Sequence, residues 1–283
     1  MNTKFSNPVL MKEIKLRFRS PKSFVGILFY LAAMSLFVFG FLYLMTTLDA
    51  PGTGGGFLNT EESFILFTIL TYIQLALVLF ITPGLTAGSI SSEREKQTLN
   101  MLLTTTQTSF QIILGKLLSS IAFLALMIVS SLPIYSLVFL FGGISPAQLA
   151  LMLFYFLLTT LAIGSVGVMF STLIRKTAVA MIATYGTMLA LTAVTGFLSV
   201  FSASLVFAGP SAGPSPMAHF WASINPAVVV ASLLSPGSGN ILSDMTGIEF
   251  PVWIIYLIFY TSLIILSVFI AVKKLRVNMK AGN

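Results

Sequence analysis

The chain has 283 residues, of which 57% are hydrophobic and only 8% are charged. A soluble domain usually carries about 25% charged residues, so this composition excludes a water-facing globular protein, and its apolar content also excludes intrinsic disorder. The absence of cysteine excludes disulfide scaffolds and metal–thiolate sites, and the net charge of +7 indicates membrane topology rather than nucleic-acid binding.

Residues 1–23 are predicted to form a cytosolic amphipathic segment that lies on the membrane. Asn7 and Pro8 provide an N-cap and a first-turn proline, and Ser20 followed by Pro21 ends the helix. At helical spacing the apolar side chains share one side. The basic side chains of the predicted interfacial helix lie opposite: Lys12, Lys15 and Arg19. An ordinary positively charged anchor beside the first span explains the same residues.

Six runs are long and apolar enough to cross a bilayer, which needs about 20 residues of helix. None contains Lys, Arg, Asp, Glu or His, and together they cover residues 24–48, 64–87, 117–141, 148–173, 178–207 and 252–272. The first run is too long for the apolar region of a signal peptide. The predicted fold class is therefore all-α, a polytopic membrane protein with a six-helix transmembrane domain over 24–272 and a basic tail over 273–283.

The basic residues predict the orientation, because loops rich in Lys and Arg stay cytoplasmic. All 15 lie before the first span, in the 89–116 loop, between the fourth and fifth spans, or in the tail. The loops on the other side carry acidic residues and one histidine instead. Both termini are therefore expected to be cytoplasmic in a multi-pass protein of the plasma (cell) membrane.

Small and polar residues mark the second span. Gly84 and Gly88 form a Gly-x-x-x-Gly pattern, a spacing that lets helices approach closely, and packing within the chain is favoured over a contact between two copies. Gln74 is the only long polar side chain deep in the spans, and it either lines a translocation path or makes an interhelical hydrogen bond. The fourth span has similar small residues: Gly164, Gly167 and Ser171.

The 89–116 loop contains a predicted short cytosolic helix. Ser92 and Glu95 have capping-box spacing. Beyond them, leucines recur at helical spacing and give one apolar edge: Leu99, Leu102 and Leu103. Such a helix either lies on lipid or docks into another protein, and its carboxylates argue against anionic lipid.

The sequence offers no residues for catalysis, cofactor binding or metal binding. Spans without charged residues disfavour an ion-coupled transporter, and one histidine without cysteine leaves no zinc motif. His219 lies outside the spans and is expected at the surface or the membrane interface. Gly115 and Lys116 do not form a phosphate loop because Phe110 replaces its first glycine, so Lys116 is interpreted as a cytosolic flank of the third span.

The 208–251 loop is long, outward-facing and nearly uncharged. Its start is rich in Gly and Pro, but the stretch from Phe220 to Leu233 is apolar and too short to span a bilayer. We expect an interfacial or re-entrant helical piece there.

The 89–116 loop resembles a segment of the type-2 permease (transmembrane) subunits of ATP-binding-cassette (ABC) transporters. The family pattern is Glu-Arg-Glu, x-x-Thr-Leu, x-x-Leu-Leu and Ser/Thr, followed downstream by Gly-Lys. This chain reads Ser92-Glu93-Arg94-Glu95-Lys96-Gln97-Thr98-Leu99-Asn100-Met101-Leu102-Leu103-Thr104, with Gly115-Lys116 entering the third span. Family members often have a proline after the leucines, where this chain has Thr105-Thr106-Gln107-Thr108. The basic start, the six spans and the long fifth loop also match, so the resemblance covers nearly the whole chain.

The resemblance implies a permease subunit of an ATP-driven exporter. It would form the pathway with a second permease subunit, as a homo- or heterodimer, and couple to separate cytosolic ATPase subunits that bind ATP and Mg²⁺. The implied ATPase-coupling element consists of Glu93, Arg94, Glu95, Leu99, Leu102 and Leu103, with Lys12, Lys15 and Arg19 beside it.

Two other functions remain open from the residues alone. A membrane scaffold or sensory subunit would use the same cytosolic helix to recruit a partner without transporting anything. A passive channel would conduct without any partner. The apolar character of the spans suits a lipid-like or amphipathic peptide cargo, should the chain belong to a transporter.

Overall fold

The computed structural model describes residues 8–48, 60–98, 107–140, 145–207, 214–234 and 246–280, and these residues are helical almost throughout, without a strand. The helices, in chain order, are α1 (Pro8–Arg19), α2 (Pro21–Leu48), α3 (Thr60–Thr86), α4 (Ser91–Glu95), α6 (Ser109–Ser130), α7 (Leu132–Leu140), α8 (Pro146–Leu173), α9 (Thr177–Leu189), the π-helical turn η1 (Ala190–Val194), α10 (Thr195–Phe207), α11 (Pro216–Ile224), α12 (Pro226–Leu234) and α14 (Val252–Lys280).

The described residues contain six helical segments that are long and apolar enough to cross a membrane. They are Ser23–Met45, Thr60–Glu95, Ser109–Phe139, Pro146–Leu173, Thr177–Leu205 and Val252–Leu275. This finding confirms the predicted all-α polytopic fold. A single run of apolar residues suffices to identify a span, because a bilayer forces each crossing segment to satisfy its own backbone hydrogen bonds.

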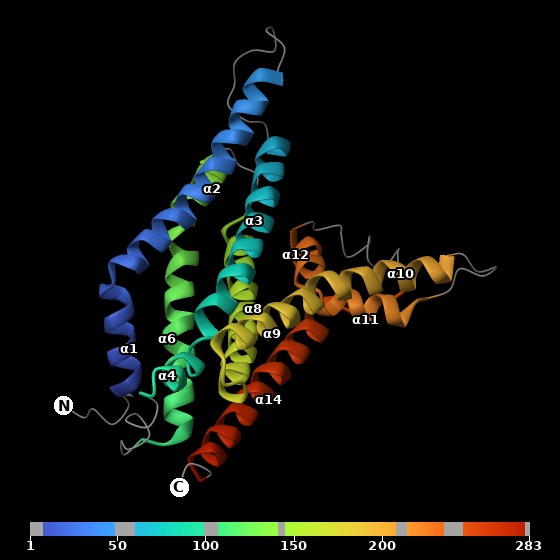
Figure 1. The fold of residues 1–283 in the computed structure, drawn as a ribbon. Coiled ribbons are helices and arrows are strands. Elements are labelled where there is room, and N and C mark those ends of the chain that lie inside the picture. The colour runs from blue at the N-terminus through green and yellow to red at the C-terminus, as the bar shows by residue number, and fades with distance from the viewer. Residues whose placement is uncertain are drawn as a thin grey trace.

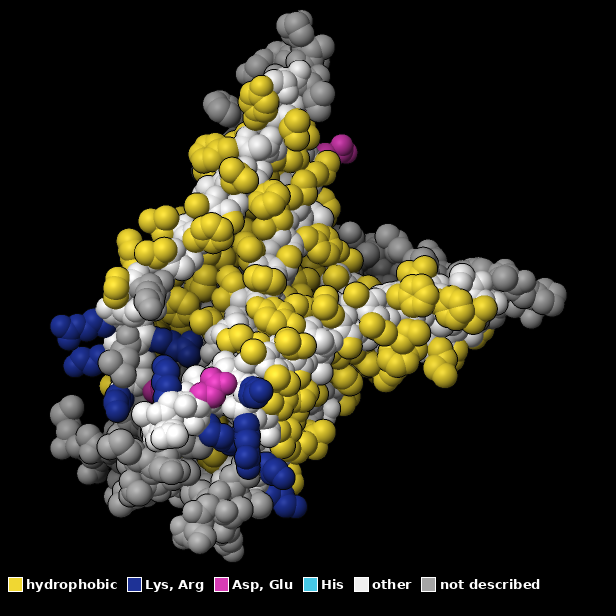
Figure 2. Space-filling view, in the orientation of Figure 1, with side chains coloured by type: hydrophobic (Ala, Val, Ile, Leu, Met, Phe, Trp, Pro, Cys, Tyr) yellow, Lys and Arg dark blue, Asp and Glu magenta, His cyan; other side chains and the backbone are white. Residues whose placement is uncertain are grey.

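The described Lys and Arg residues gather at one end of the bundle, here called the charged end. In Figure 1, α1, α4 and the C-terminal end of α14 lie at that end, while α2 and α3 reach toward the opposite one. In Figure 2, hydrophobic side chains cover most of the face shown, and the Lys and Arg side chains cluster where α1, α4 and α14 meet the end of the bundle.

The first helix begins and ends where the sequence predicts. Pro8 opens α1, Arg19 ends it, and Pro21 opens α2, so that Ser20 alone separates the two helices. The predicted cap, Asn7, lies outside the described residues. α1 packs on α6, where the ring edge of Phe18 meets Phe123 with 6.3 Å between ring centroids.

The helix of the third span begins before the apolar run and is interrupted near its end. Thr108 and Gln111 form a capping box that starts α6 at Ser109, ahead of the apolar residues. The helix is interrupted at Ser131, close to Pro133, because proline lacks the N–H that a continuous helix needs. α7 then continues the span. This start places Lys116 inside α6 rather than beside it.

Gln74 makes an interhelical hydrogen bond at this break. The Ser131 hydroxyl donates to Gln74 Oε1 over 2.9 Å, and both side chains are fully buried. Around them lies the main apolar core of the bundle, formed by α2, α3, α6, α7 and α8 with residues of α9 and α12. Among its largest fully buried side chains are Tyr30, Met34, Leu70 and Phe156.

The expected helical piece after the fifth span consists of two short helices. α11 and α12 meet at Asn225 with a bend of 92°, so the pair is either a broken seventh span or a re-entrant loop. His219, expected at the surface or interface, is instead only 4% exposed within α11, and its Nδ1 lies 3.2 Å from the Thr246 hydroxyl. Nothing in the sequence predicted the contact of Thr246 with this helix.

Small residues allow α8 to approach α3 very closely. A Cβ added at Gly167 would overlap the Thr86 hydroxyl and lie 3.3 Å from the Ala87 backbone nitrogen. The pattern formed by Gly84 and Gly88 also packs within the chain, because Cβ atoms there would meet Tyr185 and Thr177 of α9. The described residues therefore use both small-residue patterns to pack helices of one chain.

We predict that Gly167→Ala lowers the free energy of unfolding by about 1–3 kcal/mol, because the added methyl group has no space between α8 and α3. The matched control is Gly186→Ala, where a Cβ meets nothing within 4 Å. Alanine favours the helix by up to about 1 kcal/mol there, so this variant should be neutral or more stable. Thermal unfolding in detergent, followed by size-exclusion chromatography, compares the two variants. Equal melting temperatures would contradict the packing described above.

Candidate functional site

The short helix α4 lies at the charged end of the bundle and ends earlier than predicted. It runs from Ser91 to Glu95, and Gln97 then adopts a positive φ of 57°. The backbone N–H groups of Gln97 and Thr98 donate to the carbonyls of Arg94 and Glu93, which is the hydrogen-bond pattern of a Schellman motif. Glycine is the usual residue at the positive-φ position of this motif. Because this chain has Gln97 there, the end of α4 could not be predicted from the sequence. The predicted coupling residues Leu99, Leu102 and Leu103 lie outside the described residues.

The predicted capping box of α4 is wrong. Ser92 does not occupy the N-cap, and its hydroxyl donates to the Gly88 carbonyl. The start of α4 is instead capped from another helix: the Ser171 hydroxyl oxygen of α8 accepts the backbone N–H groups of Ile90 and Ser91, both over 2.9 Å. With these donors satisfied by α8, the local box is not needed.

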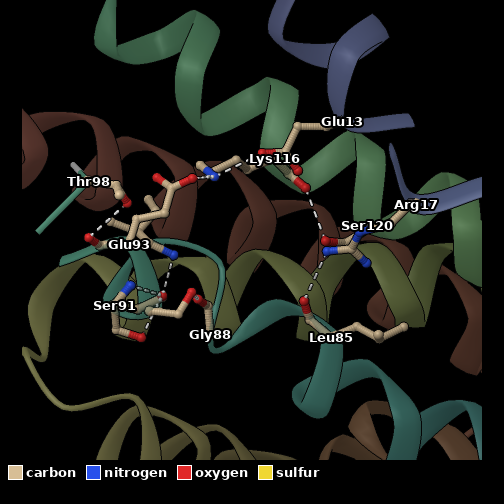
Figure 3. Close-up of polar contacts among 12 residues, drawn as sticks. Glu13, Arg17, Leu85, Gly88, Ser91, Glu93, Thr98, Lys116 and Ser120 are labelled. Atoms are coloured by element: carbon tan, nitrogen blue, oxygen red, sulfur yellow. Dashed lines mark hydrogen bonds and ion pairs between the residues drawn. The ribbon is translucent and has the colours of Figure 1, made fainter. Parts of the chain in front are cut away.

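A buried lysine joins α4 to two other helices. The ammonium group of Lys116 in α6 lies 2.6 Å from a carboxylate oxygen of Glu93 in α4 and 2.9 Å from one of Glu13 in α1 (Figure 3). The lysine side chain is 4% exposed, whereas each carboxylate side chain is 25% exposed. A buried ammonium needs such partners because its removal from water is costly.

α1 contributes Glu13 and Arg17 to this site, not the basic residues that the sequence suggested. Arg17 donates to the Leu85 carbonyl at the end of α3 over 3.4 Å. Burial lowers the pKa of the Arg17 guanidinium, and the nearby Glu13 carboxylate opposes that shift. The side chains named by the sequence analysis lie on the exposed side of the helix: Lys12, Lys15 and Arg19. Glu13 was overlooked, although it is the single acidic residue before the first span.

The next two residues of α4 bind the two helix ends that flank the α8–α9 turn. An Arg94 guanidinium nitrogen donates to the Thr172 carbonyl over 3.1 Å. The exposed Glu95 carboxylate accepts the backbone N–H and the hydroxyl of Thr177, both over 2.8 Å. A cation thus meets the C-terminal end of α8 and an anion caps the N-terminus of α9, as the dipoles of the two helices favour.

Three consecutive charged residues therefore contact three different helices. Glu93 is bound to α6, Arg94 to α8 and Glu95 to α9. Sequence spacing alone could not reveal these partners, because they lie more than 20 residues away along the chain and include neutral backbone groups. Of the other predicted residues, Gln74 lies in the core and Gly84 packs against α9. Gly88 also packs against α9, and its carbonyl accepts the Ser92 hydroxyl of α4.

Comparison with known proteins identifies the family. The protein-family model described as "ABC-2 family transporter protein" matches residues 8–273. The chain belongs to this family of ABC transporter membrane subunits. It is therefore a multi-pass permease subunit and not itself the catalytic subunit, and its family associates with ABC ATPase subunits. No curated protein matches the sequence.

The permease has no evident metal site in the part of the chain that the structure describes. There, no group of three or more His, Cys, Asp or Glu side chains is placed to hold an ion. The acidic residues of the α4 site are already bound to Lys116 or Thr177. The α4 site is therefore a junction at which ion pairs and hydrogen bonds hold helices together.

We predict that Lys116→Met destabilises the permease by about 3 kcal/mol, the lower end of the range for breaking a buried ion pair, because the carboxylates of Glu13 and Glu93 would face each other without a cation. Thermal unfolding in detergent measures the loss.

A matched variant separates charge from packing. Combining Lys116→Met with Glu13→Gln and Glu93→Gln removes all three charges and should recover most of the lost stability, since a neutral site no longer contains unpaired ions. If the triple variant is as unstable as the single one, the ion pairs are not what holds α1, α4 and α6 together.

Proposed function

We propose that this permease subunit transmits ATP-driven movement of separate cytosolic ATPase subunits to its membrane helices through α4, and that it acts in an exporter. The observation that supports this proposal is the set of contacts made by Glu93, Arg94 and Glu95 with α6, α8 and α9. A partner that displaces α4 would act on three membrane helices at once.

α4 is suited to this role because it cannot be stable alone. A helix of five residues is far below the length at which isolated helices persist in water. Its conformation depends on Ser171, Lys116 and Thr177, so α4 moves together with the helices that carry them. Rigid-body displacement of these helices would then switch the pathway between the two membrane faces.

The charged end of the bundle is the proposed cytoplasmic face. Loops rich in Lys and Arg remain in the cytoplasm, and in this chain they lie on the side of α1, α4 and the end of α14. We propose that both termini and the ATPase lie on this side of the plasma membrane. The ATPase would bind ATP and Mg²⁺. On the family resemblance, Leu99, Leu102 and Leu103 complete the ATPase-docking element.

A second permease subunit, identical or related, is proposed to complete the pathway. Exposed apolar side chains remain on α2, α10 and α14, as suits helices that face lipid or another subunit. Export as the direction rests on the resemblance to type-2 permeases.

The first experiment is purification of the tagged permease under mild detergent from its own host. A stoichiometric subunit with ATP-binding motifs supports the proposal. A scaffold or sensory subunit would instead bring down a partner without such motifs, and a channel would conduct ions as a purified chain in a planar bilayer.

We predict that Arg94→Ala combined with Glu95→Ala uncouples hydrolysis from transport. The variant loses the contacts of α4 with the ends of α8 and α9 but keeps the Glu93–Lys116 ion pair, so the fold should survive. Transport in proteoliposomes should fall roughly tenfold, within the usual range for a coupling between sites, while ATP hydrolysis continues.

The control variant is Lys274→Ala, which removes an exposed basic residue of α14 and leaves the α4 site intact. Its transport and hydrolysis should match the unaltered protein. Unchanged transport in the Arg94/Glu95 variant would show that α4 does not act through the α8–α9 turn.

A further inference from the structure

The fifth span contains a π-helical turn whose role the α4 site does not explain. Helix α9 is followed by η1, with the wider π hydrogen-bonding pattern over Ala190–Val194, and then by α10. Single π turns inside helices often mark functional sites, and they are points where a helix bends.

Asn225 fastens this turn to the bend between α11 and α12. Its side-chain nitrogen donates to the Thr192 carbonyl within the π turn over 2.6 Å and to the Thr195 hydroxyl over 3.1 Å. Asn225 is 3% exposed. Its amide reaches span five beside Gly196, where a Cβ would come within 3.0 Å of the Asn225 nitrogen. A larger residue at position 196 would therefore push the amide away.

The same side chain also holds the bend at its own position. Asn225 Oδ1 accepts the backbone N–H groups of Ala227 and Val228, over 2.9 and 3.3 Å, and so caps α12. Its backbone N–H donates to the Ala222 carbonyl and closes α11. Asn225 thus connects two places where the regular α-helix is interrupted: the π turn and the 92° bend.

Helix α10, which follows the π turn, and helix α11, which precedes the bend, pack on each other. α10 packs along α11, and the pair extends sideways from the bundle (Figure 1). The other sides of α10 are exposed, as at Phe197, Val200 and Leu205. The pair also contacts the bundle where α11 packs on α14, and there the Tyr260 hydroxyl donates to the Ile224 carbonyl next to Asn225.

We propose that α10 and α11 move as one arm that turns on the π turn and the 225–226 bend, and that Asn225 is the positioning residue that fixes the angle of the arm. The pivot residues lie together, because Asn225 binds Thr192 and Thr195 directly. The arm is a second moving element of the permease, separate from the junction at α4.

The experiment uses spin labels on the full-length permease in lipid nanodiscs, without an ATPase partner. The chain has no cysteine, so paired cysteines can be introduced without background. One pair, Val200→Cys with Met217→Cys, measures the distance within the arm between α10 and α11. The other, Met217→Cys with Phe80→Cys, measures the distance from the arm to α3. All three positions are exposed.

The test variant is Asn225→Ser, which keeps a side-chain oxygen able to cap α12 but lacks the amide that reaches Thr192. We expect the arm-to-α3 distances to redistribute, with the minor population rising at least roughly threefold, because the hydrogen bonds to Thr192 and Thr195 are both lost and one interhelical hydrogen bond in a membrane is worth roughly that factor. The distance within the arm should stay unchanged. Gly196→Ala should act in the same direction, since its methyl group displaces the amide.

Two results would overturn the proposal. If Asn225→Ser leaves the arm-to-α3 distances as they were, Asn225 does not set the angle. If the distance between α10 and α11 broadens instead, the two helices are not one arm. Both results are independent of the ATPase, so they leave the proposed coupling through α4 untouched.

Discussion

The structure depends on one buried ammonium group. Lys116 lies inside a membrane helix, where an unpaired cation would be costly, and it is accommodated only because α1 and α4 each bring a carboxylate to it. These two carboxylates, Glu13 and Glu93, lie 80 residues apart in the chain. The ion pairs therefore tie α1 and α4 to α6, beside the contacts of Phe18 and Arg17 in α1 and the hydrogen bonds that bind α4 to α8 and α9.

Close packing between α3 and α8 also positions α4. Gly167 lets the end of α3 approach α8, and this approach brings Ser171 within hydrogen-bonding distance of the first backbone N–H groups of α4. Charge thus positions one side of α4, and small residues position the other. Neither interaction alone explains why three consecutive side chains reach three different helices.

Features that depend on neighbouring residues could be predicted from the sequence, whereas contacts between residues distant in the chain could not. The six spans and the bounds of α1 follow from apolar runs and from proline, whose effects act within a few residues. The capping box at Ser92 was wrong because Ser171, distant in sequence, competes for the same backbone groups. Lys116 was interpreted as a flank because a search for uncharged runs cannot recognise a lysine that two distant carboxylates neutralise. The buried position of His219 was missed for the same reason, since Thr246 belongs to a segment far along the chain.

The single residue between α1 and α2 has a consequence for the membrane itself. With only Ser20 between them, a change in the tilt of α2 is passed on to α1, and Glu13 and Arg17 connect α1 to the α4 site. A helix longer than the hydrocarbon layer adjusts by tilting, so the thickness of the bilayer acts on α2 directly. We therefore expect lipid chain length to affect the same junction that the ATPase is proposed to move.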